Sequence, residues 1–277
     1  MTALYGGGEY FRNREFGSPQ SGGYHGYRDY VSDRQHIEEK FSDVLRLVES
    51  LRPPGDLLDV GAGPGFLMSA ARRRGWRPVG IELNPWAVRY ATETLSLDVR
   101  LNPLGAEPFE PSSFDAVTMM DLLEHTSSPV EVVAEAARVL RRDGVLAVLT
   151  PDAGSPVSRA LGARWPEIQR VPEHLVLFSV RGLASLLHRC GLDVVAWHSI
   201  GKRSQLRTLV ADVSPVAPAI GRWRGRVAER SRLADRVVEI DPHTKFCLYA
   251  RHRAAVGDRG SRRVPRRSGA LRRSEGG

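Results

Sequence analysis

The chain has 277 residues and a formal net charge of +8, with 42% hydrophobic and 26% charged residues. That length buries a full core. No apolar run approaches the roughly 20 residues of a membrane helix, and the N-terminus has no signal-peptide pattern. The two cysteines lie far apart, without a metal-ligand partner at short spacing. We therefore expect a reduced, cytoplasmic protein with no disulfide, no membrane span and no zinc site.

The positive charge is concentrated at one end of the chain. Residues 251–277 hold nine arginines and two acidic residues, so they carry +7 and the other 250 residues carry +1. Because this segment lacks apolar periodicity, we predict a disordered basic tail over 254–277. RNA, an anionic membrane or an acidic partner are open alternatives as its ligand, beside a solvated appendage without a function of its own. The nearly neutral remainder predicts no nucleic-acid partner.

Residues 1–31 form a segment rich in glycine and tyrosine, with five of the seven tyrosines of the chain. It has too much glycine for a helix and too many aromatic residues for an ordinary solvated tail. Two interpretations stay open: a lid that folds over a site, and a loose extension.

The central part of the chain alternates between buried strands and helices. Ser32 and Gln35 have capping-box spacing and open a helix that ends at Pro53–Pro54. Apolar runs then predict strands at 56–60, 77–82, 98–101, 114–120 and 144–150, and the stretches between them predict helices at 64–74, 84–95 and 128–142. This alternation is typical of a doubly wound α/β fold with a parallel sheet.

Three local signals support the helix boundaries. Asn84 precedes a proline at a first helical position, and Ser128 and Glu131 have capping-box spacing around another proline. We expect Gly144 to end the helix that begins there.

After residue 150 the pattern changes. Residues 151–178 are irregular, a helix is predicted at 180–190 and strands at 192–200 and 244–250. Two helical stretches interrupted by Pro215 and Pro218 lie between the last two strands.

A glycine-rich turn follows the first predicted strand. Asp59 ends that strand, and Gly61, Gly63 and Gly65 follow at every second position, which lets the backbone approach a ligand. The dinucleotide fingerprint needs its third glycine one residue later, where this chain has Phe66. Glu82 ends the next strand, where a carboxylate can accept both hydroxyls of a ribose. Nicotinamide and adenosyl cofactors both fit these features.

Four motifs in order distinguish the two cofactors: LLDVGAGPG, GIELN, FDAVTMMDLLEH and VLRRDGVLAVLTP. With them the chain resembles the class I S-adenosylmethionine-dependent methyltransferases, and is most similar to the small-molecule branch with the ubiquinone-biosynthesis O-methyltransferases. The resemblance runs from about 56 to 150, with a looser continuation through EHLVLFSVRGLASLLHRCGLDVV. It implies a Rossmann-like methyltransferase domain over 32–253, with a seven-stranded mostly parallel sheet whose last strand is antiparallel. Residues 151–178 would be an insertion on the substrate side.

The resemblance also implies roles for the cofactor-binding residues. Asp59 and the loop of Gly61, Ala62, Gly63 and Gly65 would receive the methionine part of S-adenosylmethionine. Glu82 would bind the ribose, and Leu83 would cover one face of the adenine. The other face would meet Leu104 and Gly105, and Asp121 and Leu122 would line the pocket near the sulfonium.

Three histidines are candidates for a general base. His125 follows the fourth predicted strand, His174 lies in the irregular stretch and His243 precedes the last strand. Imidazole suits proton transfer near neutral pH, and we expect His125 or His174 to be catalytic, ahead of His243. Their spacing predicts no metal site. Trp165 and the N-terminal tyrosines are candidates for acceptor contact, with core packing as the alternative for Trp165.

We therefore predict a methyltransferase that acts on a hydroxyl, or an amine, of a small metabolite, natural product or glycan-like acceptor. The alternatives are an RNA or protein methyltransferase that uses the basic tail, and a cofactor-binding module without catalysis. The glycine spacing and the fourth motif disfavour a nicotinamide oxidoreductase.

Overall fold

A computed structural model describes residues 31, 34–170, 173–205, 237–241 and 243–254. The predicted N-terminal lid, the Ser32 cap, the helices around Pro215 and Pro218 and the tail from residue 255 lie outside the described residues. Within those ranges, no helix has the length and apolar character needed to cross a bilayer.

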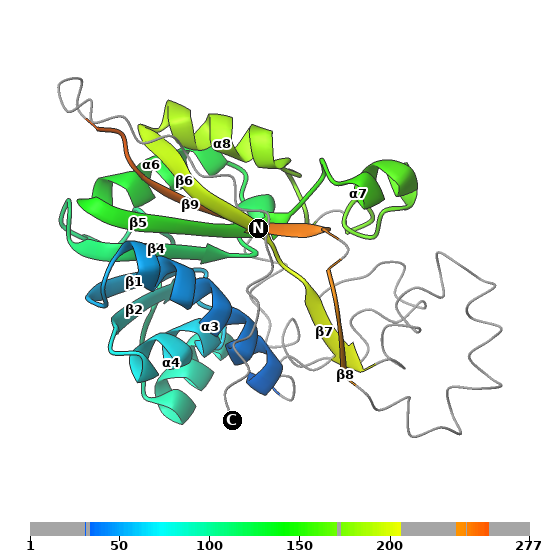
Figure 1. Ribbon diagram of the computed structural model, residues 1–277. Coiled ribbons are helices and arrows are strands. Elements are labelled where there is room, and N and C mark those ends of the chain that lie inside the picture. The colour runs from blue at the N-terminus through cyan, green and yellow to red at the C-terminus, as the bar shows by residue number, and fades with distance from the viewer. Residues whose placement is uncertain (1–30, 32–33, 171–172, 206–236, 242, 255–277) are drawn as a thin grey trace, which may run out of the picture.

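A seven-stranded sheet forms the centre of the molecule (Figure 1), in the order β3-β2-β1-β4-β5-β9-β6. Its strands are β1 (Asp56–Val60), β2 (Arg77–Glu82), β3 (Asp98–Leu101), β4 (Phe114–Met120), β5 (Leu140–Pro151), β6 (Leu192–Ser199) and β9 (Lys245–His252). The pairs among β1 to β5 are parallel, whereas β9 is antiparallel to both β5 and β6. The predicted sheet, with its antiparallel last strand, is confirmed.

Helices cover both faces of this sheet. One face packs against α3 (Arg34–Leu51), α4 (Phe66–Arg73) and α5 (Pro85–Arg89), and the other against α6 (Pro129–Val139) and α8 (Val180–Arg189). Successive strand residues alternate between the two cores: Leu57 belongs to the first and Leu58 to the second. Because both faces are buried, the strands read as continuous apolar runs in the sequence.

The predicted end of one helix was wrong, and two other predicted helices differ in detail. The helix of 128–142 ends at Val139, and Gly144 lies inside β5, at a bulge where the register against β4 shifts. A Cβ at Gly144 would lie 2.9 Å from the carbonyl oxygen of Arg141, so the bulge requires glycine. Ser128 makes no side-chain cap hydrogen bond. The helix of 84–95 divides into α5 and a π-helical turn, Tyr90–Thr94.

Other local features follow their sequence signals more closely. The Asn84 Oδ1 atom accepts hydrogen bonds from the backbone N–H groups of Trp86 (2.9 Å) and Ala87 (3.1 Å), as the cap prediction requires. The irregular stretch after β5 contains a short helix, α7 (Pro156–Leu161), and a 3₁₀ turn, Gly162–Arg164. A second, two-stranded sheet of β7 (Lys202–Gln205) and β8 (Val237–Ile240) was not predicted.

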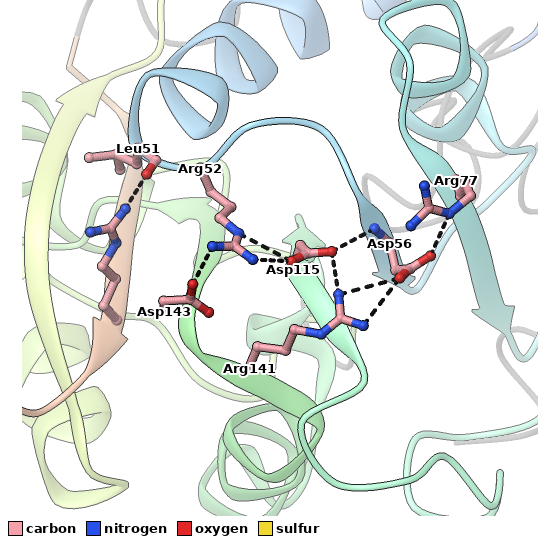
Figure 2. A network of polar contacts seen from close by, with 8 residues as sticks. Leu51, Arg52, Asp56, Arg77, Asp115, Arg141 and Asp143 are labelled. Atoms are coloured by element: carbon pink, nitrogen blue, oxygen red, sulfur yellow. Dashed lines mark hydrogen bonds and ion pairs between the residues drawn. The ribbon is translucent and has the colours of Figure 1, made fainter.

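An ionic network ties together the amino ends of β1 and β4 and the bulge of β5 (Figure 2). The Asp115 carboxylate accepts hydrogen bonds from Arg52 Nε at 3.1 Å, Arg52 Nη2 at 2.5 Å and the backbone N–H of Asp56 at 2.9 Å. Arg141 also contacts Asp115, and it reaches the Asp56 carboxylate at 3.3 Å. Asp115 is 6% exposed, so the network has a buried carboxylate at its centre.

Asp115→Ala should therefore destabilise the protein. The variant removes the carboxylate that Arg52 and Arg141 share. Because both arginines are partly exposed, we expect the free energy of unfolding to fall by about 2–4 kcal/mol. Asp143→Ala is the matched control, since Asp143 also pairs with Arg52 but its side chain is 67% exposed, and we expect a loss of about 0–1 kcal/mol. Urea unfolding measures both. Equal losses would contradict the central place of Asp115.

Candidate active site

Three acidic residues meet at one edge of the sheet. Asp59 and Glu82 lie at the ends of β1 and β2, and Asp121 follows β4. The register pairs Val60 with Ile81 and with Met119, so the three strands end side by side. In open α/β sheets this carboxyl edge is where ligands bind. The strand ends that carry these predicted site residues therefore lie side by side.

The glycine loop is held against the end of β2. The backbone N–H groups of Gly61 and Ala62 both donate to the carbonyl oxygen of Ile81, at 2.9 and 3.1 Å. Gly61 has a φ of +73°, and a Cβ there would lie 2.8 Å from Leu122 Cδ1. Gly65, with a φ of +83°, precedes the first residue of α4. The loop therefore needs glycine for its left-handed backbone and for the close approach of Leu122.

Glu82 joins this loop to its own strand. Its Oε2 atom accepts a hydrogen bond from Gly63 N at 2.7 Å, and its Oε1 atom accepts from Leu83 N at 2.7 Å and Asn84 N at 2.9 Å. Burial raises the pKa of Glu82, and the three N–H donors oppose that rise. The side chain is thereby fixed in one orientation. Leu83, beside it, is 45% exposed.

Asp59 is a buried carboxylate close to this loop. Its Oδ1 atom accepts a hydrogen bond from Thr118 Oγ1 at 2.6 Å. Burial raises the pKa of Asp59 to about 7, the Thr118 hydroxyl opposes the rise and the charge of Glu82 adds to it. A cation bound at this edge would favour the ionised form.

Asp121 is the carboxylate of a second ionic cluster. It accepts a hydrogen bond from Lys245 Nζ at 2.8 Å, and Lys40 Nζ lies 3.7 Å from its other oxygen. Burial alone would raise the pKa of Asp121, but the two ammonium groups lower it below its ordinary value. Sequence reasoning missed both lysines. Lys40 lies on a helix and Lys245 begins the last strand, so only the fold brings them to Asp121.

The two predicted catalytic histidines are in contact. His125 lies on the 3₁₀ turn Leu123–His125, and its ring centroid is 4.8 Å from that of His174. The Nδ1 atom of His125 lies 2.9 Å from the carbonyl oxygen of Glu173, and that of His174 lies 3.0 Å from the carbonyl oxygen of Glu167. Burial lowers the pKa of His125, and it lowers the pKa of His174 to about 4. Both imidazoles are therefore neutral at pH 7.

Each histidine has a defined tautomer. A carbonyl oxygen only accepts, so each Nδ1 carries the proton and each Nε2 is the basic nitrogen. The backbone holds the two residues together, because the carbonyl oxygen of Glu124 accepts from the N–H groups of Leu175 (2.7 Å) and Val176 (3.2 Å).

The remaining candidates occupy less distinctive positions. Leu104 is half-buried against the core on the α6 side, and Gly105 is exposed with a φ of +95°. Trp165 is 2% exposed, which matches its core-packing alternative. His243 is exposed and lies 3.5 Å from Asp241.

The comparison with protein families decides the classification. Residues 30–196, more than half of the chain, match a family model described as a methyltransferase domain. The chain belongs to this family. The predicted resemblance to class I S-adenosylmethionine-dependent methyltransferases of the small-molecule branch is confirmed, and S-adenosylmethionine is the cofactor of the domain.

Individual relatives of the methyltransferase domain agree with this classification. The ubiquinone biosynthesis O-methyltransferase of Xanthomonas campestris pv. campestris strain B100 is 36% identical over 106 residues, 35% of this chain and 44% of that protein. Its namesake in Thiobacillus denitrificans is 34% identical over 153 residues, 51% of this chain and 65% of that protein. The chain thus spans about half the length of the curated relatives it matches. A Bacillus halodurans C-125 protein assigned as a methyltransferase has the same fold, with a TM-score of 0.57 and 17% identity over 77% of this chain and 98% of that one.

Asp59→Asn should stabilise the ligand-free methyltransferase domain above neutral pH. The folded protein holds the Asp59 proton with a pKa of about 7, above the ordinary value of 3.8. Ionisation of Asp59 therefore lowers the free energy of unfolding as the pH rises from 3.8 to about 7, and this loss is complete above pH 7. We expect Asn to add about 1–3 kcal/mol at about pH 8 and markedly less at about pH 5.

Thermal unfolding at the two pH values measures this difference. Asp98→Asn is the control, because Asp98 is exposed at the start of β3, and we expect changes within about 0.5 kcal/mol. A variant at position 59 that is equally stabilised at both pH values would contradict the proposed burial of a charge.

Proposed function

We propose that the methyltransferase domain transfers the methyl group of S-adenosylmethionine to a hydroxyl of a small-molecule acceptor. The observation that carries this proposal is the contact between two neutral histidines, with basic Nε2 atoms, at the 3₁₀ turn that follows β4. A hydroxyl must lose its proton as it is methylated, and imidazole assists such a step. Two relatives named as O-methyltransferases support oxygen as the accepting atom.

The cofactor occupies the carboxyl edge in this proposal. Asp59 and the loop Gly61, Ala62, Gly63 and Gly65 receive the ammonium and carboxylate of the methionine part. Support comes from Asp59, whose buried carboxylate is paired with the Thr118 hydroxyl and would gain from a bound ammonium.

Glu82 accepts a hydrogen bond from the ribose. Its carboxylate has about four lone-pair positions, and backbone N–H groups use three of them, which fixes its orientation and leaves one position for a ribose hydroxyl. The exposed side chain of Leu83 covers one face of the adenine, and Leu104 and Gly105 lie at its other side. Asp121 and Leu122 line the pocket near the sulfonium, and Leu122 already packs over Gly61.

The transfer needs alignment more than chemical assistance. The acceptor oxygen forms its bond to the methyl carbon as the carbon–sulfur bond breaks, which yields S-adenosylhomocysteine, and the hydroxyl proton leaves toward His125 or His174. The reacting atoms must approach in line, at about 3–3.5 Å. Residues 151–170 and 173–178 lie over this edge in the proposal, and the second of these segments contributes His174.

The acceptor is a small molecule rather than RNA or protein. Outside residues 251–277 the chain carries a net charge of only +1, and the two lysines at the carboxyl edge, Lys40 and Lys245, are paired with Asp121. The two cysteines, Cys190 and Cys247, are free thiols, which supports a reducing, cytoplasmic compartment.

Glu82→Ala should weaken S-adenosylhomocysteine binding. Loss of a charge-assisted hydrogen-bond acceptor for the ribose is worth about 2 kcal/mol, or roughly 30-fold in Kd. Calorimetry measures both proteins, with Glu93→Ala as control, because Glu93 is exposed on the neighbouring π-helical turn. Binding of NAD in place of S-adenosylhomocysteine would overturn the cofactor assignment.

His174→Gln should separate binding from transfer. We expect S-adenosylhomocysteine affinity to stay within about threefold, and methyl transfer to a hydroxylated aromatic acceptor to fall by about 10²-fold or more. Release of S-adenosylhomocysteine is measured with hydroxybenzoates, with the matching aminobenzoates and without acceptor. His188→Gln, at an exposed histidine of α8, is the control. Turnover with the amines alone would contradict oxygen as the accepting atom.

A further inference from the structure

The ammonium group of Lys40 lies at the carboxyl edge of the sheet and shares its acidic partner. Lys40 Nζ is 3.7 Å from Asp121 Oδ2, which is an ion pair but exceeds hydrogen-bond distance. The other oxygen of Asp121 accepts a hydrogen bond from Lys245 Nζ at 2.8 Å. Lys245 is therefore the closer partner of Asp121. An ammonium group has three N–H donors, so Lys40 retains donors for a further acceptor atom.

This ammonium group is also partly withdrawn from water. The side chain of Lys40 is 29% exposed, although it extends from a helix at the surface of the domain. Burial lowers the pKa of Lys40, whereas the charge of Asp121 opposes that change. A desolvated ammonium group gains free energy when an anion binds beside it.

A buried hydroxyl without a partner lies on the same side of the sheet. Lys245, Cys247 and Tyr249 alternate along β9, so their side chains share the face that packs against α3. Tyr249 is 0% exposed, and its hydroxyl has no hydrogen-bond partner among the described residues. Such a group lowers stability, and a ligand oxygen beside it would remove that loss.

The thiol of Cys247 shows that the ammonium group and the hydroxyl are close together. Burial raises the pKa of Cys247 to about 12, and both the Tyr249 hydroxyl and the Lys40 ammonium oppose this rise. All three groups therefore lie within interaction range of one another. A thiol is a weak hydrogen-bond acceptor and is neutral at pH 7, so it does not compete with an anion for Lys40.

From these contacts we propose that the Lys40 ammonium and the Tyr249 hydroxyl bind a carboxylate group of the acceptor. The acceptor is then a hydroxylated organic acid. This inference rests on the proposed function, since it names the class of acceptor for the same site. The candidate base His125 lies on the turn that follows Asp121, the partner of Lys40. A small acid held by its carboxylate at Lys40 can therefore direct its hydroxyl toward the histidines.

The cofactor carries the same chemical group, because its methionine part has a carboxylate. In the proposed function that carboxylate meets the glycine loop, where left-handed glycines bring the backbone close to a ligand. Lys40 is assigned to the acceptor instead of the cofactor. Cofactor binding and acceptor binding must therefore be measured separately.

The experiment uses calorimetry on the full-length protein saturated with S-adenosylhomocysteine, with 4-hydroxybenzoate and its neutral amide as probes. We expect the wild type to bind the acid at least about tenfold more tightly than the amide. Lys40→Met should weaken acid binding by about tenfold or more and change amide binding less than about threefold. Lys40→Arg keeps the charge and should retain most of the preference.

Two further variants complete the comparison. Tyr249→Phe removes only a buried hydroxyl, so it should fold normally and weaken acid binding by about threefold or more. Arg46→Gln is the control, because Arg46 is an exposed cation on the same helix, α3. It should leave the affinity for both probes unchanged.

These binding measurements need no turnover, so they are independent of the proposed methyl transfer. Equal affinity of the wild type for the acid and the amide overturns the inference, and so does an equal loss of both in Lys40→Met. Thermal unfolding establishes that Lys40→Met is folded. A folded Lys40→Met that binds S-adenosylhomocysteine about tenfold more weakly would assign Lys40 to the cofactor carboxylate and overturn the inference. Tight acid binding without methyl transfer would support the anion site and contradict the proposed function.

Discussion

The contact between the Gly63 N–H group and the Glu82 carboxylate, 2.7 Å long, is the interaction on which the proposed cofactor site depends. It joins the loop after β1 to the end of β2, and parallel strands bring those two ends to the same edge. The same carboxylate accepts two further backbone N–H groups, so its position is set before any ligand arrives. Because the carboxylate is already held in place, less conformational entropy is lost when a ligand binds. Gly61 is needed in this loop because its backbone is left-handed and the Leu122 side chain leaves no room for a Cβ there.

The sequence predicts this part of the molecule well because its signals are local. The strands are buried on both faces, and so they appear as uninterrupted apolar runs, as in β4 (Phe114–Met120). The order of the strands in the sheet then follows from the resemblance to a known fold. Once β1 and β2 are paired in parallel, Asp59 and Glu82 lie at the same edge of the sheet. The Asn84 cap was equally local, since one side chain satisfies two N–H groups within three residues.

The features that sequence analysis missed depend on contacts between distant segments. Gly144 looked like a helix stop, but the chain forms a bulge there because β5 must pair with β4 on both sides of it. Lys40 and Lys245 are 205 positions apart and meet only at Asp121. His125 and His174 were singled out one by one for their chemistry, yet their ring contact arises from a loop that folds back over the 3₁₀ turn after β4. No periodicity encodes such convergence.

The two ends of the sheet differ in how many of their buried carboxylates are paired with a cation. At the amino end, Asp115 is paired with Arg52 and Arg141, so its burial contributes to stability. At the carboxyl end, burial raises the pKa of Asp59 and of Glu124, and no arginine or lysine among the described residues is paired with either. Unpaired buried carboxylates destabilise a fold unless something cationic binds beside them. S-adenosylmethionine supplies such a cation through its ammonium group. The unpaired carboxylates at the carboxyl edge are therefore suited to cationic ligands, but they lower the stability of the ligand-free fold. The ionic network at the amino end offsets part of this loss.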